Sequence, residues 1–451
     1  MGKLFGTDGI RGEVNQPPLQ PDFVLKIGRA LGEFWNEEEA SNLVLLGHDG
    51  RLSADYLQNL LAGALQSVGH EVVKIGLTST PGLAAAVARE DTAGGIMISA
   101  SHNPYYDNGI KPFQSTGEKF TDGQERRVEN LFNEDIKSAY RDEIGTTGPA
   151  KDSFQPYIDE LTGGLEGSFE RSVLVDCANG GCSELAPAIL ERVCADVTFI
   201  NRSPDGKNIN RNAGSLHVQK LKEKKDNLGA EVGFALDGDG DRLLAVDEEG
   251  EVVDGDSLLY MLSSYLREQN RLAGGIVITV MSNLGLRRAL DRADIDYEVV
   301  GVGDRKVYRK LVENGWVLGG EQSGHIINRS HLPTGDGLKT LVSVLELLRE
   351  GEKTLAEWNG MVPEYPQVLQ NFEVESKPPL EELEGATNKI KNVEEKLGRE
   401  GRVLVRYSGT EPVARVMLEG KNEGRLKKFA SEIGSKIVEE IEAAGRRSGS
   451  D

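Results

Sequence analysis

Three aspartates at alternate positions form the most distinctive cluster of the sequence. They lie in Asp237-Gly238-Asp239-Gly240-Asp241-Arg242, between two apolar runs that predict strands, Val232–Leu236 and Leu243–Val246. Carboxylates spaced in this way by glycines allow a short loop to fold around one hard cation, with positions left open for water or phosphate oxygens, as a catalytic Mg²⁺ requires. The sequence therefore predicts a divalent-metal site formed by Asp237, Asp239 and Asp241.

A calcium-binding loop is the alternative interpretation of these aspartates, because Glu248 falls at the twelfth position counted from Asp237. The sixth position of such a loop must be glycine, and here it is Arg242. Strands rather than helices are also predicted on both sides of the loop. We therefore reject the helix–loop–helix calcium site.

A serine loop gives the second signal. Ser99-Ala100-Ser101-His102-Asn103-Pro104 follows the predicted strand Gly95–Ile98, so Ser101 is expected on a turn at the carboxyl end of that strand, where open α/β sheets place their sites. The pair Ser101-His102 also resembles a hydrolase pair, but the G-x-S-x-G elbow is absent and adjacent side chains seldom bond to each other. The following stretch, Asp107–Lys111, adds a cation.

Two further loops carry polar groups between glycines. Arg406-Tyr407-Ser408-Gly409-Thr410-Glu411-Pro412, with Arg415 beyond it, offers hydroxyls, exposed backbone N–H groups and two arginines, which suits an anion but lacks a nucleotide-binding lysine. Gly319–His325 holds Glu321 and Ser323, which suit sugar hydroxyls, and His325 as a candidate proton carrier.

Two shorter stretches complete the set, and together the groups indicate one kind of chemistry. Gly6–Gly12 is a polar loop that contains Arg11, and Gly303-Asp304-Arg305 opens a predicted helix with another cation. A hydroxyl nucleophile, a metal loop, a polyol-binding loop and a phosphate cradle are the parts that phosphoryl transfer needs.

The elements that must position these loops alternate between strands and helices, which predicts an α/β class. Polar stretches near Gly145–Lys151, Gly250–Asp256 and Gly360–Tyr365 are the candidate linkers. They predict three α/β domains: 1–150 with the serine loop (Ser99–Pro104), 151–253 with the metal loop (Asp237–Arg242) and 254–364 with the sugar loop (Gly319–His325). A smaller C-terminal α+β domain is predicted at 365–451.

Composition restricts the partners. The formal net charge is −21, which repels nucleic acid and anionic lipid, so we expect neither nucleic acid nor membrane as a partner. Three cysteines are too few for a disulfide framework, and no run of 18 apolar residues occurs. These features, with an N-terminus that lacks a signal-peptide pattern, lead us to expect a cytoplasmic protein.

The sequence resembles the α-D-phosphohexomutase superfamily over essentially its whole length, and the motifs occur in the same order. The metal loop and the serine loop are the most specific parts of the resemblance. It implies three similar mixed-sheet α/β domains and a smaller C-terminal α+β domain around a central cleft. It also implies an intramolecular phosphotransferase of the isomerase class.

The resemblance implies a phosphoserine mechanism. Ser101 would be phosphorylated in the resting enzyme, and its phosphoryl group would complete, with the three aspartates, the shell of one Mg²⁺ per active site. The phosphoserine would donate to one sugar hydroxyl to give a 1,6-bisphosphate, whose other phosphate would return to Ser101. A sugar 1,6-bisphosphate would act as the activator.

Further roles follow from the same resemblance. Lys111, Arg11 and His325 would share proton transfer and charge stabilisation, and which of them is the general base is left open. His102 and Arg242 would orient the serine and metal sites, and Glu321 and Ser323 would bind sugar hydroxyls. The phosphate that is not reacting would be held by Arg406, Ser408, Gly409, Thr410 and Arg415.

Four stretches favour the branch that interconverts glucosamine 6-phosphate and glucosamine 1-phosphate, so a hexosamine phosphate is the expected substrate. Gln322 matters most among them, since the mannose and glucose phosphate branches usually carry Met there. Those two branches are the alternative, and a non-enzymatic sugar-phosphate-binding protein is a third hypothesis. Monomer and homodimer are both left open. The four stretches are Gly6–Gly12, Met281–Gly285, Val302–Arg305 and Gly320–His325.

Overall fold

The computed structural model describes residues 3–38, 41–148, 153–163, 165, 169–408 and 411–448. The chain divides into two compact units, each made of two segments. The first is Met1–Thr279 with Ile295–Met361, and the second is Val280–Asp294 with Val362–Asp451. Within the described ranges, no helix combines the length and the apolar character that crossing a membrane would require.

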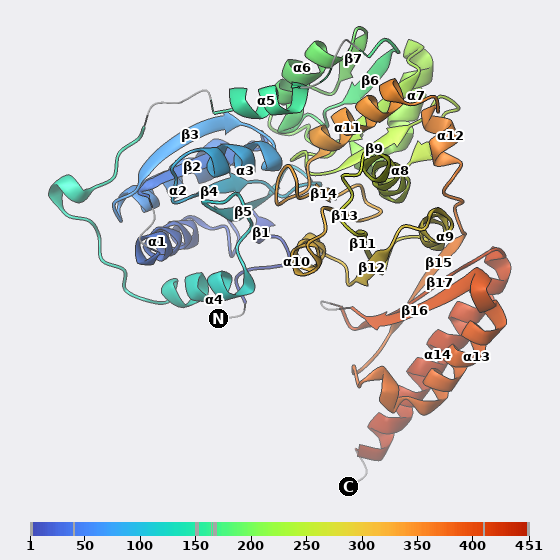
Figure 1. The fold of residues 1–451 in the computed structure, drawn as a ribbon. Helices are drawn as coiled ribbons and strands as arrows, with labels where there is room; N and C mark the ends of the chain where they lie inside the picture. The colour runs from blue at the N-terminus through green and yellow to red at the C-terminus, as the bar shows by residue number, and fades with distance from the viewer. Residues whose placement is uncertain are drawn as a thin grey trace. The chain divides into compact units, whose positions relative to one another are not determined.

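Three sheets in the first unit share one strand order (Figure 1). In each, three strands run parallel with the earliest of them in the middle, and a fourth strand is antiparallel to the third. This repetition agrees with the predicted series of similar α/β units. The strands are β2 (Leu43–His48), β3 (Glu71–Leu77), β4 (Gly94–Ile98) and β5 (Asp107–Gln114); β6 (Val173–Asp176), β7 (Val197–Ile200), β8 (Val232–Leu236) and β9 (Leu243–Val246); and β11 (Ile276–Thr279), β12 (Tyr297–Val300), β13 (Leu318–Gly320) and β14 (Ile326–Asn328).

Two short strands extend the first two sheets at the antiparallel edge. β1 (Ile10–Glu13) pairs with β5, and β10 (Val252–Val253) pairs with β9. The stretch Gly250–Asp256 therefore differs from the linker expected there, because it contains β10 and Asp254, which caps the next helix. Two adjacent valines between acidic residues are too short a run to predict a strand.

The first sheet shows why these strands read as continuous apolar runs. In β2, Val44 and Leu46 pack toward one core and Leu45 toward another, because successive side chains point to opposite faces. Helices α1 (Pro21–Glu37) and α2 (Ala54–Gln66) contribute to the first core, and α3 (Thr80–Arg89) to the second. A sheet covered on both faces needs no polar alternation.

The remaining helices of the first unit connect or cover the strands. Several begin at residues suited to capping: the side chain of Ser79 accepts from a backbone N–H of α3, and Asp336 does the same for α11. The helices are α4 (Asp122–Leu131), α5 (Gln155–Thr162), α6 (Cys182–Val193), α7 (Val218–Leu228), α8 (Gly255–Glu268), α10 (Asp304–Asn314), α11 (Gly337–Glu350) and α12 (Leu355–Asn359).

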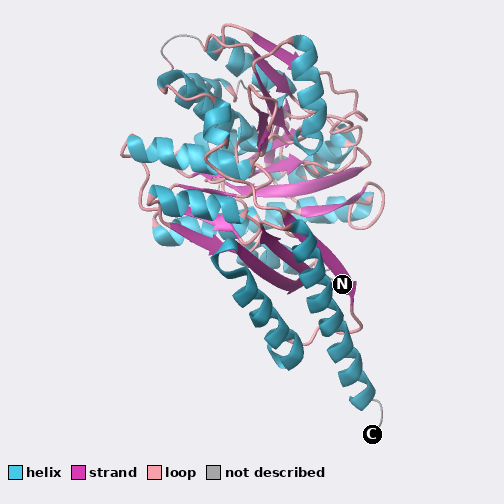
Figure 2. Ribbon diagram, turned by 90° about the vertical axis from the view of Figure 1, so that its right-hand side faces the viewer, coloured by secondary structure: helices cyan, strands magenta, loops and turns pink. Residues whose placement is uncertain are grey.

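The second unit is built on an antiparallel sheet with the order β15 (Gln367–Glu373), β17 (Val413–Gly420), β16 (Gly401–Tyr407). Helices α13 (Glu384–Leu397) and α14 (Glu423–Ser448) cover one face of this sheet (Figure 2). Helix α9 (Leu284–Ala293) joins them, since the buried carboxylate of Glu419 accepts from its first N–H group and from Arg402. This unit is the α+β part of the fold.

Candidate active site

The serine, metal and sugar loops occupy the same place in the three sheets. Each connects the third parallel strand to the antiparallel strand beside it: β4 to β5, β8 to β9, and β13 to β14. The carboxyl ends of parallel strands are where α/β folds place their sites. The repeated topology therefore places the three predicted site loops at equivalent positions.

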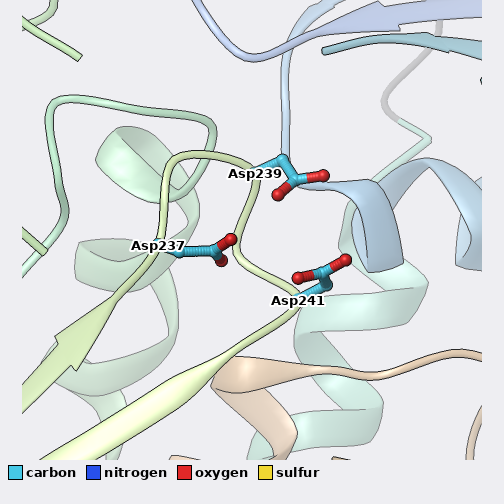
Figure 3. A group of neighbouring side chains, drawn as sticks. All are labelled: Asp237, Asp239 and Asp241. Carbon is cyan, nitrogen blue, oxygen red and sulfur yellow. The ribbon is translucent and has the colours of Figure 1, made fainter. Parts of the chain in front are cut away.

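The three aspartates of the metal loop meet as predicted. Asp237, Asp239 and Asp241 are all buried, and each offers a carboxylate oxygen within 4.8 Å of those of the others. Figure 3 shows the three side chains close together on this loop. Oδ1 of Asp239 and Oδ1 of Asp241 have no hydrogen-bond partner among the described residues. A buried acceptor without a partner is costly, so this donor set fits a hard divalent cation.

Three helices direct their first turns at the backbone of this loop. The N–H of Thr80 in α3 donates to the carbonyl of Asp239 (2.7 Å), that of Gly181 before α6 donates to Gly238 (2.8 Å), and that of Gly337 in α11 donates to Gly240 (3.0 Å). Helix N-termini carry partial positive charge, which favours the three carboxylates. The loop is thus held from three sides before any cation binds.

Neighbouring charges shift the pKa values of Asp237 and Asp239 in opposite directions. Burial and the carboxylates of Asp241 and Asp239 raise the pKa of Asp237 well above its ordinary value. Burial would also raise the pKa of Asp239, but Lys111 and the hydroxyl of Thr80 outweigh it and lower that pKa. Asp239 therefore stays ionised more readily than Asp237.

Ser101 faces the metal loop. Its side chain is 1% exposed, and its Oγ donates to Oδ2 of Asp237 at 2.8 Å. Its backbone is left-handed, with φ 52°, which is unusual for a residue with a side chain. The predicted nucleophile and the predicted metal ligands, 136 residues apart in sequence, thus form one site.

The buried ion pair between Asp49 and Arg51 supports the serine loop. Oδ2 of Asp49 accepts from Nε of Arg51 (2.9 Å) and from the hydroxyl of Ser99 (2.6 Å), whose Oγ in turn accepts from the N–H of Ser101 (2.8 Å). The guanidinium of Arg51 also donates to the carbonyls of Ser101 and Asn103. Both charged side chains are completely buried, so the loop rests on a paired charge.

A series of ion pairs with alternating charge begins at Asp239 of the metal loop. Nζ of Lys111 lies 2.7 Å from Oδ2 of Asp239 and 2.8 Å from Oδ2 of Asp8, whose Oδ1 lies 2.8 Å from Nζ of Lys119. Lys119 also pairs with Asp304, the first residue of α10. Burial would lower the pKa of Lys111, but Asp239 and Asp8 raise it, so this lysine is held as a cation.

His325 lies between Asp304, at the far end of this series of charges, and Asp241 of the metal loop. Nε2 of His325 lies 3.9 Å from Oδ2 of Asp304 and 3.7 Å from Oδ2 of Asp241. The ring is buried, and neither of its nitrogens has a hydrogen-bond partner among the described residues. Arg11, whose guanidinium pairs with Asp8, lies on the same side of the site.

His102 lies beside Ser101, and Arg242 lies beside the aspartates. Nδ1 of His102 is 3.3 Å from Oγ of Ser101. Burial and the cations Arg242 and Arg11 lower the pKa of His102 to about 4, so its imidazole is neutral near pH 7. Nε of Arg242 lies 3.7 Å from Oδ1 of Asp241.

The sugar loop is ordered by its own side chains. Oε1 of Glu321 accepts from the N–H of Gly303 (3.0 Å), and Nε2 of Gln322 donates to Asp254, the cap of α8 (3.0 Å). Ser323 is exposed. Of the residues predicted here, His325 reaches the metal loop, Glu321 braces the start of α10, and Gln322 braces the start of α8.

The predicted phosphate cradle lies in the second unit. Arg406 of β16 and Arg415 of β17 are directly opposite each other, and Oγ of Ser408 accepts from the N–H of Glu411 (3.2 Å). Like charges directly opposite on a sheet are unfavourable. Glu411 offsets one of them, because its Oε2 lies 2.6 Å from Nη2 of Arg415. Gly409 and Thr410 lie outside the described residues.

Several residues of the site carried no role in the sequence interpretation. Asp8 had a signal, because it lies in the Gly6–Gly12 loop that supplied Arg11. Asp49 and Arg51 follow a strand beside the serine strand, which could have indicated them. Thr80 and Asn210 had no local signal, because each meets its partner only when separate domains pack together.

The comparisons with known proteins agree with this site. Models of the phosphoglucomutase/phosphomannomutase family match in four parts: alpha/beta/alpha domain I over residues 2–139, domain II over 155–250, domain III over 254–365, and the C-terminal domain over 369–435. The chain belongs to the phosphoglucomutase/phosphomannomutase family. The predicted superfamily and fold class are thereby confirmed.

Relatives that match over their full length carry a more specific name. A phosphoglucosamine mutase of Shouchella clausii (strain KSM-K16) is 44% identical over 449 residues, which cover 98% of this chain and 100% of that protein. A phosphoglucosamine mutase of Idiomarina loihiensis is 42% identical over 451 residues, covering 98% and 99%. These relatives are mutases, in agreement with the predicted reaction class.

Solved structures share the fold. A phosphoglucomutase/phosphomannomutase family protein from Burkholderia thailandensis superposes with a TM-score of 0.82 at 24% identity, covering 97% of both chains. An Aspergillus fumigatus N-acetylphosphoglucosamine mutase, solved in complex with GlcNAc-6P and magnesium, gives a TM-score of 0.67 at 17% identity, covering 97% of this chain and 96% of that one.

Proposed function

We propose that this chain interconverts glucosamine 6-phosphate and glucosamine 1-phosphate through a phosphorylated Ser101 and a 1,6-bisphosphate intermediate. The observation that carries the proposal is the 2.8 Å contact between Oγ of Ser101 and Oδ2 of Asp237, beside two carboxylate oxygens that have no hydrogen-bond partner among the described residues. A hydroxyl held at a cation-binding cluster is the arrangement that transfer of a phosphoryl group to and from serine needs.

The metal loop is proposed to hold one Mg²⁺ through Asp237, Asp239 and Asp241, with Ser101 as the fourth protein ligand. Three carboxylates and open positions suit this ion, which prefers oxygen ligands and keeps several waters. When bound, it would neutralise charge on the transferring phosphoryl group. The residues of the chain supply the rest: the three helix N-termini fix the loop, and Thr80 and Lys111 fix Asp239.

The general base is proposed to be His325. Among the three candidates, Lys111 is held as a cation by two carboxylates, and Arg11 donates through its guanidinium to Asp8 and has no acceptor atom. The ring nitrogens of His325 have no hydrogen-bond partner among the described residues, so one of them is available to accept the proton of a sugar hydroxyl. Lys111 and Arg11 would then stabilise negative charge on the phosphoryl oxygens.

The sugar and phosphate contacts are also proposals. Glu321 and Ser323 would bind sugar hydroxyls, and His102 and Arg242 would orient the serine and metal sites. Gln322 would act through the shape of its loop, since its amide bonds to Asp254. The group that does not react would be bound by Arg406, Ser408, Gly409, Thr410 and Arg415, and a sugar 1,6-bisphosphate would phosphorylate Ser101 at the start.

The remaining sequence predictions keep this status. We propose four domains at 1–150, 151–253, 254–364 and 365–451, and a cytoplasmic location with neither nucleic acid nor membrane as partner. The three cysteines support a reducing compartment, because all are free and buried.

The test is kcat/KM for glucosamine, glucose and mannose 6-phosphates on one preparation phosphorylated with a bisphosphate. We expect glucosamine 6-phosphate to be preferred by at least about tenfold, a difference of roughly 1.4 kcal/mol in transition-state binding. A preference for mannose or glucose phosphate would move the chain to the alternative branches. Binding of all three without turnover would favour a non-enzymatic sugar-phosphate-binding protein.

A further inference from the structure

The carbonyl oxygen of Ser101 accepts hydrogen bonds from two domains. Nη2 of Arg51, from the serine domain, lies 2.8 Å from this oxygen, and Nδ2 of Asn210, from the metal-loop domain, lies 2.9 Å from it. Both side chains also reach the carbonyl of Asn103, at 2.9 Å and 3.3 Å respectively. Two donors therefore hold the carbonyl groups of Ser101 and Asn103, the residues on either side of His102.

These hydrogen bonds hold the backbone of Ser101 in a conformation that is unfavourable for a residue with a side chain. Ser101 has φ 52°, in the left-handed region, and residues with a Cβ remain there when their surroundings impose it. If the carbonyl of Ser101 were released, the residue could relax toward a right-handed conformation, and Oγ would turn away from Asp237. The direction of the nucleophile thus depends on its carbonyl donors.

Asn210 is built into the metal-loop domain. Its side chain is 8% exposed, its N–H donates to the carbonyl of Ala178 (2.9 Å), and its own φ is 57°. A Cβ at Gly238 would lie 2.7 Å from Nδ2 of Asn210 and 2.7 Å from the carbonyl oxygen of Ser101. The metal loop, Asn210 and the serine backbone are therefore in close contact, and Gly238 leaves the space for it.

We propose that Asn210 is a positioning residue for Ser101, which sets the nucleophile against the metal loop by holding its carbonyl from the second domain. This inference rests on the proposed function, in which Ser101 receives and donates a phosphoryl group. Asn210 touches no reacting atom. It acts through the backbone of Ser101, so its loss would slow the transfer steps and leave sugar binding almost unchanged.

The test uses Asn210→Gly, because glycine removes the amide and accepts a positive φ without strain. Asn212→Gly is the matched control. Asn212 lies two residues further along the same loop, has φ 55° and is exposed. Asn210→Asp is the third variant, which keeps the shape of the side chain and replaces the donating amide by an acceptor. Thermal unfolding of all three checks that each variant is folded.

Two quantities are measured: the rate at which glucose 1,6-bisphosphate phosphorylates Ser101, and kcat with KM for glucosamine 6-phosphate. For Asn210→Gly we expect both the labelling rate and kcat to fall by about 10- to 100-fold, the scale of a small misplacement of a reacting group. KM should change less than about threefold. Asn210→Asp should be at least as impaired, and Asn212→Gly should match the wild type.

Other outcomes would overturn the inference. Wild-type labelling in Asn210→Gly or in Asn210→Asp would show that the donated bonds do not set the nucleophile. Equal losses in Asn212→Gly would show only a general loosening of the loop. If the wild type is labelled on Ser101 but converts no hexose phosphate, the labelling rates still decide the role of Asn210. A wild type that is never labelled would contradict the proposed function itself, and this inference with it.

Discussion

The ammonium group of Lys111 lies 2.7 Å from Oδ2 of Asp239, and both side chains are buried although 128 residues separate them. One carboxylate of the proposed metal site is therefore paired with a cation of the chain. Asp8 holds the same ammonium from the other side at 2.8 Å. Removal of the lysine would leave Asp239 without this cation, whereas Asp8 would keep Lys119 and Arg11. An uncompensated buried charge is strongly unfavourable.

Lys111→Met is predicted to lower kcat by at least about 100-fold, because it removes charge stabilisation and loosens Asp239. The methionine keeps most of the volume. Steady-state kinetics with glucosamine 6-phosphate measures the effect, and Lys220→Met, an exposed lysine of α7, is the control. Activity within threefold of the wild type would refute the role given to Lys111.

Removal of the metal should have a comparable effect. Asp239→Asn is predicted to cost at least about 100-fold in kcat, and EDTA should inactivate the wild type. Mg²⁺ should restore the activity, whereas Ca²⁺ should do so poorly because it adopts larger and looser coordination. Full activity in the presence of the chelator would contradict the assignment of the Asp237–Asp241 loop.

His48 is predicted to make stability depend on pH. Burial lowers the pKa of His48, opposed in part by Asp49 and Asp55, and its Nδ1 accepts from the N–H of Gly50 at 3.1 Å. Below the ordinary histidine pKa of roughly 6.5, the unfolded chain binds a proton that the folded chain does not, so stability falls as the pH drops. The contribution is present above that pKa and lost as the pH falls through the lower folded value.

The measurement compares the free energy of unfolding of the wild type with that of His48→Asn, whose Oδ1 can still accept from Gly50. Between about pH 7.5 and about pH 5, the wild type should lose more stability than the variant. Parallel pH profiles for the two proteins would show that His48 does not titrate in this way.

The site loops could be predicted from the sequence because each is local. The aspartates of the metal loop and Ser101 follow apolar runs directly, and their glycine and proline neighbours mark turns. The strand order of the three sheets could not be predicted, since a run of four to seven apolar residues does not specify its neighbours. The short strands β10 and β14 were missed for the related reason that two or three residues give no periodicity.

The charged partners of the site depend on tertiary packing. Lys111 is predicted as a cation, but its bond to Asp239 joins the first α/β domain to the second, and the bond from Lys119 to Asp304 joins the first to the third. Asn210 reaches Ser101 across 109 residues. Such contacts cannot be predicted from residue spacing along the chain, because each forms only when the domains pack together.

The C-terminal arginines give a further prediction. Arg406→Ala should raise KM for glucosamine 6-phosphate and also lower kcat, because a charge-assisted phosphate contact is lost and the sugar is aligned less well. Arg425→Ala, which removes a donor to the carbonyl of Lys396, is the control on the same unit. An unchanged KM with normal labelling of Ser101 would place phosphate binding elsewhere.

The central claim is that Ser101 carries the phosphoryl group, and intact-mass analysis with peptide mapping tests it most directly. Wild-type chain and Ser101→Ala are incubated with glucose 1,6-bisphosphate and Mg²⁺, and their turnover of glucosamine 6-phosphate is followed in parallel. The account predicts one phosphate-sized increment on the wild-type peptide that contains Ser101, and neither increment nor turnover in the folded variant. Wild-type turnover by Ser101→Ala, or a phosphate on a different residue, would contradict it.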